Sequence, residues 1–150
     1  MLRLFYRISS FCCALILATC SWRVQFLIIN AAATPREVTI ELDVKSRGFL
    51  IFDPRKFTLY PYDEEIDYTH EQSAAKPLQS SLKIVIPPKS ALVIGRLNNQ
   101  HYENSRQRFI NDRVFNLVRV QAGKHEVTRD SFDQHFRKTA AGLAYQIPND

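Results

Sequence analysis

The chain has 150 residues, of which 45% are hydrophobic and 23% are charged, with seven prolines and four glycines. This balance excludes a disordered, a collagen-like or a coiled-coil protein, and the length allows one domain or a leader followed by one domain. The formal net charge of +5 does not exclude a protein that binds anions, so the placement of the charges decides that question.

The first 33 residues differ from the rest of the chain in charge. No acidic residue occurs before Glu37, and the only charged side chains in this segment are those of Arg3, Arg7 and Arg23. The basic start is followed by apolar runs over residues 11–18 and 24–29 and by three alanines at 31–33. These features match the three parts of a secretory signal. We therefore predict an N-terminal hydrophobic leader helix within residues 1–33 and a single exported β-rich domain over residues 34–150.

Three interpretations of this leader remain open. It is a signal peptide cleaved after Ala33, or an uncleaved anchor in the inner membrane, because residues 11–29 are almost long enough to span a bilayer. Arg23 and Gln25 interrupt the apolar stretch and weigh against the anchor. The third interpretation is a lipoprotein, since Leu17-Ala18-Thr19-Cys20 resembles a lipid-attachment box. All three export the domain, to the periplasm or the medium, and an uncleaved leader would be its contact with the membrane.

The leader also accounts for the cysteines and for much of the basic charge. Cys12, Cys13 and Cys20 all precede residue 34, so the predicted domain has no disulfide and no thiolate ligand. Three of the 20 basic residues lie in the leader, which leaves 17 against 15 acidic residues and a net charge of +2. Export and this small charge argue against nucleic acid as a partner.

The first half of the predicted domain contains three predicted strands. Residues 38–44 alternate between apolar and polar side chains, which is typical of a strand with one wet face. The continuous apolar run at residues 49–52 fits a strand covered on both faces, and residues 56–60 form another candidate. A polar loop is expected from Pro61 to about Ser81.

The second half contains three further strands and one helix. Strands are expected over residues 82–86 and 91–94, separated by a turn or edge at Pro87-Pro88, and over residues 114–120. Residues 98–112 fit a loop or one short helix. The best helix candidate runs from Asp130 to Leu143, because its apolar residues share one face and its charges suit the helix dipole. The apolar residues in question are Phe132, Phe136, Ala140 and Leu143.

About six strands, no repeated βαβ pattern and one late helix predict a mainly β fold, an antiparallel β-sandwich or small β-roll with one C-terminal α-helix. The strand at residues 114–120, Val-Phe-Asn-Leu-Val-Arg-Val after an arginine-rich loop, resembles the corresponding stretch of the periplasmic pilus chaperones. This resemblance implies an immunoglobulin-like sandwich. The phenylalanines are expected in the core rather than in a ligand site, namely Phe49, Phe52, Phe57, Phe115, Phe132 and Phe136.

No catalytic motif is present in the sequence. It lacks the Gly-x-Ser-x-Gly nucleophile elbow, a glycine-rich phosphate loop and the His-Glu-x-x-His zinc motif. His101, His125 and His135 are either a nitrogen-ligand metal site or three unrelated histidines. The acidic stretch at residues 63–71 could attract calcium but lacks the spacing of an EF-hand loop, so we interpret it as a solvated loop. No metal or cofactor is predicted.

The remaining candidate site is basic and aromatic, and comprises Tyr102, Arg106, Arg108, Arg113 and Arg119. It is either a solvated region whose arginines pair with the acidic loop or a rim that binds a partner, since arginine and tyrosine are frequent interface anchors. The leading hypothesis is a non-enzymatic envelope or secreted domain that binds a protein partner through this rim or through strand edges, in an assembly, adaptor or chaperone-like role. The alternatives are a small secreted hydrolase or lyase with dispersed histidines and carboxylates, and a membrane-tethered extracytoplasmic domain.

Overall fold

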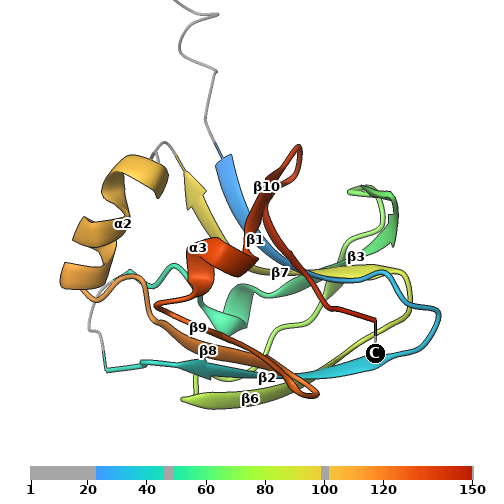
Figure 1. Ribbon diagram of the computed structural model, residues 1–150, viewed down its shortest axis with the longest axis horizontal. Helices are drawn as coiled ribbons and strands as arrows, with labels where there is room; N and C mark the ends of the chain where they lie inside the picture. The colour runs from blue at the N-terminus through green and yellow to red at the C-terminus, as the bar shows by residue number, and fades with distance from the viewer. Residues whose placement is uncertain (1–22, 46–48, 99–101, 150) are drawn as a thin grey trace, which may run out of the picture.

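A computed structural model describes residues 23–45, 49–98 and 102–149, the side chains of residues 103 and 104 excepted (Figure 1). The fold is mainly β, as the sequence predicts, and consists of two sheets in which nearly all neighbouring strands are antiparallel. The larger sheet has the order β10-β11-β1-β7-β3-β4, with β5 also paired to β3. The smaller sheet has the order β6-β2-β8-β9.

The strands of the larger sheet are β1 (Arg23–Asn30), β3 (Thr58–Asp63), β4 (Glu65–Ile66), β5 (Gln72–Ser73), β7 (Ser90–Asn98), β10 (Arg137–Thr139) and β11 (Gly142–Gln146). Those of the smaller sheet are β2 (Arg36–Leu42), β6 (Ser81–Ile86), β8 (Leu117–Ala122) and β9 (His125–Thr128). The helical elements are η1 (Pro54–Lys56), α2 (Tyr102–Asn111) and α3 (Phe132–His135). The predicted strands at 38–44, 56–60, 82–86, 91–94 and 114–120 are confirmed as β2, β3, β6, β7 and β8 with shifted ends, and α2 confirms the short helix.

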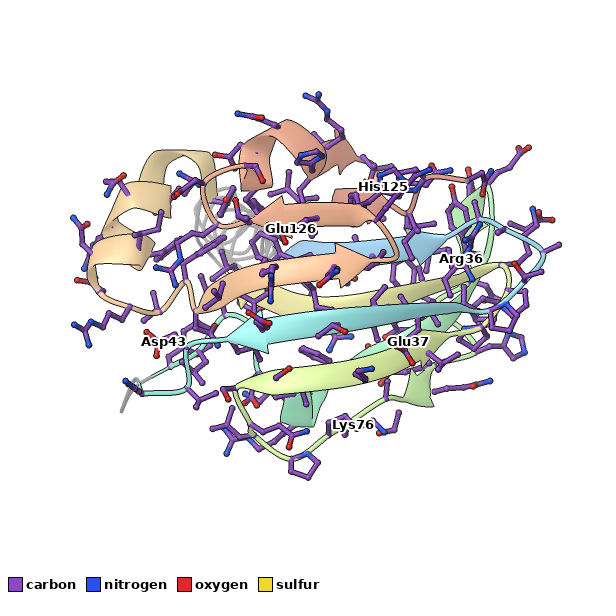
Figure 2. All side chains as sticks on the ribbon, turned by 60° about the horizontal axis from the view of Figure 1, so that its bottom comes forward. Arg36, Glu37, Asp43, Lys76, His125 and Glu126 are labelled. Carbon is purple, nitrogen blue, oxygen red and sulfur yellow. The ribbon has the colours of Figure 1, made fainter. Side chains whose placement is uncertain are left out.

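The two sheets pack face to face around one apolar core. Phenylalanine rings from β1, from the irregular segments before η1 and β8 and from α3 meet at its centre, where Phe115 contacts Phe52 and Phe132 edge-on at centroid distances of 5.1 Å. Five of the six predicted core phenylalanines are buried, whereas Phe49 is 56% exposed. The outer face of the smaller sheet is mainly polar, with Glu37 on β2 and Glu126 on β9 directed to solvent (Figure 2), although Val85 and Val118 are exposed there too.

The second apolar run of the predicted leader forms β1, an inner strand of the larger sheet. It pairs antiparallel with β7 on one side and parallel with β11 on the other. Phe26, Leu27 and Ile28 are completely buried. The alanines at 31–33 lie in the turn to β2, which is held by Asn30: its side chain donates to Thr34 O at 2.9 Å and accepts from Ala32 N at 3.1 Å.

The predicted leader therefore extends into the sheet. A chain cut after Ala33 would lack β1, although cleavage at that bond stays a prediction. The predicted leader helix falls on residues 1–22, outside the described residues. Within the part of the chain that the structure describes, no helix is long and apolar enough to cross a bilayer.

The predicted strand at residues 49–52 is wrong. Leu50, Ile51 and Phe52 are buried, but their backbone is an irregular segment before η1. The buried side chain of Asn116 replaces a strand neighbour, since it accepts from Phe52 N at 3.0 Å and donates to Phe52 O at 2.9 Å. One side chain thus satisfies the buried polar groups that a neighbouring strand would otherwise have to pair.

The predicted helix from Asp130 to Leu143 is also wrong beyond its first turn. It ends at His135 as α3, and the chain then forms the hairpin of β10 and β11. Gly142 has a φ of 138°, and a Cβ atom there would overlap the carbonyl of Gln25 on β1. Pairing of β11 with β1 requires this close approach, and that tertiary contact overrides a helical pattern in the local sequence.

The fold predicts where the chain can be shortened. A chain beginning at Thr34 should fail to fold, because burial of each large β1 side chain contributes about 1.5–3 kcal/mol and a whole domain is stable by only about 5–15 kcal/mol. A chain beginning at Arg23 should unfold in one cooperative thermal transition, measured by circular dichroism. Cooperative unfolding of the Thr34 chain at a similar temperature would contradict the central place of β1.

Candidate functional site

The outer face of the larger sheet carries a second, smaller apolar cluster that points away from the main core. It consists of Leu27, Ile29, Tyr60, Ala91, Val93 and Ala144, all buried. Two segments flank this face: residues 62–73, which we call the acidic flap, and the β10–β11 hairpin at residues 137–146. The candidate site lies between them.

The acidic flap is fastened to the sheet by aromatic and polar contacts. The ring of Tyr68 packs edge-on against that of Tyr60 at a centroid distance of 5.1 Å, and the Tyr60 hydroxyl donates to Glu71. The guanidinium of Arg96 donates to Thr58 Oγ1 at 2.7 Å and to the Tyr60 hydroxyl at 3.2 Å. Burial raises the pKa of Tyr60, so its phenol remains protonated and can donate at neutral pH.

The tip of the flap is a tight turn with exposed carboxylates. Glu64 adopts a φ of 63° between β3 and β4, and Asp67 N donates to Pro61 O at 3.0 Å. Hydrogen bonds from the Thr69 hydroxyl and backbone, followed by the His70 ring, lower the pKa of Asp67 to about 2. The Asp67 carboxylate is therefore charged at neutral pH.

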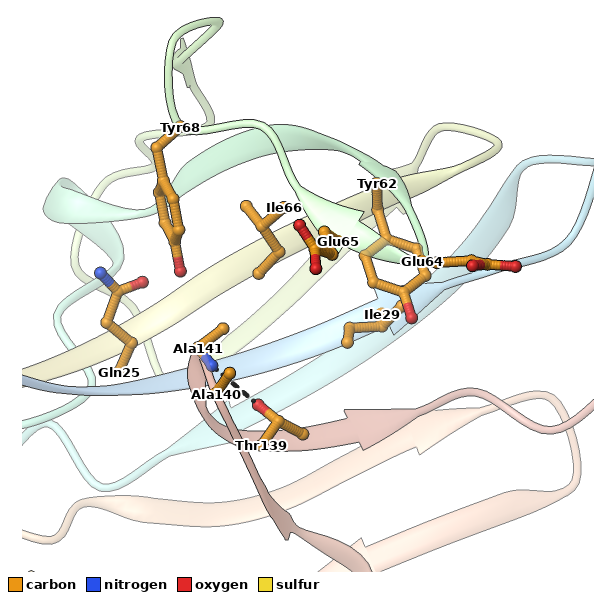
Figure 3. Close-up of a pocket in the computed structure, with 10 residues that line it drawn as sticks. All are labelled: Gln25, Ile29, Tyr62, Glu64, Glu65, Ile66, Tyr68, Thr139, Ala140 and Ala141. Carbon is orange, nitrogen blue, oxygen red and sulfur yellow. Dashed lines mark hydrogen bonds between the residues drawn. The ribbon is translucent and has the colours of Figure 1, made fainter.

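A pocket of about 500 Å³ lies between the flap and the hairpin (Figure 3). Gln25 and Ile29 of β1 form its floor, and Thr139, Ala140 and Ala141 at the hairpin turn form one wall. The other wall belongs to the flap and consists of Tyr62, Glu64, Glu65, Ile66 and Tyr68. The Thr139 hydroxyl accepts from Ala141 N at 3.2 Å and donates to Gly142 O at 3.0 Å, which fixes the hairpin turn.

Gln25 is the unusual residue of this pocket. This residue is only 9% exposed, and its Oε1 atom is buried with no hydrogen-bond partner among the residues that the structure describes. Figure 3 shows its amide directed upward towards the hydroxyl end of Tyr68. An unsatisfied buried acceptor costs about 1–3 kcal/mol. A donor on a bound molecule would offset that cost.

Sequence reasoning did not identify Gln25 as a functional residue. A polar amide inside the apolar run at residues 24–29 is the signal that could have found it. The same residue was interpreted only as an interruption of a membrane span. The sequence indicates the flap as an acidic stretch, but it predicts a helix for the opposite wall of the pocket at residues 139–141.

The structure brings Tyr102 and Arg106 of the predicted arginine rim together as an internal contact. Tyr102 is buried and its hydroxyl donates to Asp133 at 3.0 Å. Arg106 Nε lies 2.9 Å from the Asp133 carboxylate, and its guanidinium also donates to Arg129 O at 2.9 Å. Burial, with the Asp133 charge second, raises the pKa of Tyr102 well above its usual range. The three side chains join α2 to α3.

The other residues of the rim are placed separately. Arg108 is exposed on α2, and its Nε atom lies 3.5 Å from Oδ2 of Asp112. Arg113 is exposed just after the helix and has a φ of 57°. Arg119 lies on β8 between Glu41 and Glu126. Arg108 and Arg119 thus pair with carboxylates of their own surroundings, not with the acidic flap, which was one of the two interpretations.

Of the three histidines considered for a metal site, the structure describes two. His125 lies on β9, and His135 lies on α3 edge-on to Tyr145 at 6.3 Å, while His101 is outside the described residues. Over residues 23–45, 49–98 and 102–149, no three His, Cys, Asp or Glu side chains are gathered closely enough to hold a metal ion.

Comparisons of the whole chain with protein-family models, curated proteins and solved structures find no match. The chemistry of the pocket is therefore what supports a functional proposal.

The contacts of Arg106 predict a difference between two arginines of α2. Arg106→Ala should lower the free energy of unfolding by about 1–2 kcal/mol, because it removes hydrogen bonds between half-buried groups. The control Arg108→Ala should change it by less than about 0.5 kcal/mol, since its ion pair is exposed. Urea denaturation measures both values. Equal effects would contradict the structural role of Arg106.

Proposed function

We propose that the protein is an exported, non-enzymatic domain of the β-sandwich type that binds a protein partner in the cell envelope or outside the cell. The pocket between the acidic flap and the hairpin is part of the binding surface. The role is that of an assembly, adaptor or chaperone-like component. The single observation that carries the proposal is the unpaired, buried Oε1 atom of Gln25 at the floor of an open pocket.

The lining of the pocket supports binding. A volume of about 500 Å³ is within the usual range for ligand sites. Apolar walls with a few inward polar groups are typical of such sites, because the apolar surface supplies affinity and the polar groups fix orientation. Tyr62 and Tyr68 add aromatic surface, and tyrosine is among the residues that contribute most to protein interfaces.

The charge of the flap supports a protein rather than a nucleic acid. The flap has five carboxylates, those of Asp63, Glu64, Glu65, Asp67 and Glu71. Their field repels a phosphate backbone and attracts basic side chains. The partner's surface is therefore expected to be basic where it meets the flap.

Export remains part of the proposal, with a shorter leader. Because β1 begins at Arg23, a leader that is removed without loss of the fold is confined to residues 1–22. That segment still contains the basic start, the apolar run at 11–18 and the Leu17-Ala18-Thr19-Cys20 motif. The inner-membrane anchor and the lipoprotein are the tethered forms of the same proposal.

Site-specific photo-crosslinking in the organism of origin tests the proposed surface. A photoreactive phenylalanine at Tyr68 should form one discrete adduct of higher mass with another protein. As the control, the photoreactive phenylalanine replaces Gln121, which is exposed on the smaller sheet, and it should give no such adduct. Adducts at both positions, or at Gln121 alone, would refute the pocket as the partner's site.

A further inference from the structure

We propose that the pocket receives a primary ammonium on an apolar stem, the side chain of a lysine presented by the partner. This inference rests on the proposed function and names the chemistry that the pocket recognises. It is carried by the unpaired Gln25 oxygen together with the charge and the apolar walls around it.

The polar groups of the pocket suit an ammonium because they can accept hydrogen bonds. Figure 3 shows the Gln25 amide directed towards the Tyr68 hydroxyl, with the Glu65 carboxylate farther along the flap, on the other side of Ile66. A lysine ammonium has three donors and no acceptor, so it can donate to the Gln25 amide oxygen and the Tyr68 hydroxyl, while the Glu65 carboxylate adds negative charge to the same pocket. Tyr68 is 46% exposed and lies at the mouth, so its side chain can shift to admit the ligand.

The charge of the flap favours a cation in this position. Glu64 and Glu65 line the pocket and Asp67 lies beside them on the flap. Arg96 of β7, in register with Gln25, donates to Thr58 and Tyr60 and does not line the pocket, and its Nε atom is also buried without a partner among the described residues. A carboxylate next to a desolvated ammonium offsets part of the cost of removing that ion from water.

The walls suit the stem of a lysine. Ile29, Ile66 and Ala141 supply apolar surface on three sides. The methylene chain of lysine can cover such surface while its charged end reaches a polar group. The rings of Tyr62 and Tyr68 add faces that attract a cation.

The direct probe is N-acetyl-lysine N-methylamide, titrated into the folded domain and followed by nuclear magnetic resonance. With about 0.3 kcal/mol for each of its non-hydrogen atoms, the expected Kd is about 1 mM. Shifts should concentrate at Gln25, Tyr68 and Ala141. The matched norleucine derivative, which has the stem without the ammonium, should bind about tenfold more weakly, as should the Nε-acetylated lysine derivative.

Two variants test the named acceptors. Gln25→Leu and Glu65→Gln should each weaken binding of the lysine probe about tenfold, since the first removes a hydrogen-bond acceptor and the second removes the negative charge that attracts the ammonium. Gln25→Leu should leave the thermal midpoint unchanged or raise it, because it removes an unpaired buried acceptor. Gln121→Leu, on the other sheet, should leave the affinity unchanged.

Several outcomes would overturn the inference. Equal binding of the lysine and norleucine probes would show that the ammonium is not recognised. If the corresponding derivative of arginine bound more tightly than the lysine probe, the pocket would be assigned to a guanidinium. No saturation by about 50 mM would dismiss the pocket as a lysine site. Crosslinks at Tyr68 without lysine binding would overturn this inference alone, whereas lysine binding without crosslinks would overturn the protein partner and not the pocket chemistry.

Discussion

Both faces of β1 are buried, and both layers of the molecule depend on that strand. Phe26 and Ile28 point into the core between the sheets, whereas Leu27 and Ile29 belong to the apolar cluster on the outer face. Because side chains alternate along a strand, the same eight residues hold the two sheets together and form the floor of the pocket. Gln25 lies on the outer side of this strand, in register with Arg96 of β7. The Oε1 atom of Gln25, which has no hydrogen-bond partner among the described residues, is thus fixed by a strand that is buried on both faces.

The two walls of the pocket come from segments far apart in the chain. The hairpin reaches the floor through the parallel pairing of β11 with β1, which requires the close approach of Gly142. The flap is joined to β3 and is held mainly through Tyr60. A rigid floor with separately anchored walls can orient a ligand while the exposed Tyr68 adjusts. This arrangement is suited to recognition, since strand backbone positions an acceptor more accurately than a loop does.

The strands with one wet face were the easiest to predict, although the sequence also predicted β7, which is buried on both faces. β2 and β6 alternate between buried and exposed residues, so period two is visible in their sequences. β1 has no wet face, and a short buried strand has the same composition as the apolar part of a leader. At residues 49–52, hydrogen bonds to the Asn116 side chain take the place of the expected strand pairing. Within the helix expected for residues 130–143, pairing of β11 with β1 overrides the helical pattern. Both contacts join residues that are far apart in the chain. The pocket could not be predicted because its floor and its two walls come from segments that are far apart in the chain, although the acidic wall is visible in the sequence as a polar stretch.

Identification of the N-terminal residue of the protein isolated from the envelope or medium is the most direct test, because the larger sheet and the floor of the pocket both require β1. Mass spectrometry of the N-terminal peptide measures it. We predict that the folded protein begins at or before Arg23 and therefore retains Arg23–Asn30. A folded exported protein that begins at Thr34 would contradict it, since neither the larger sheet nor the floor of the pocket could then exist as described.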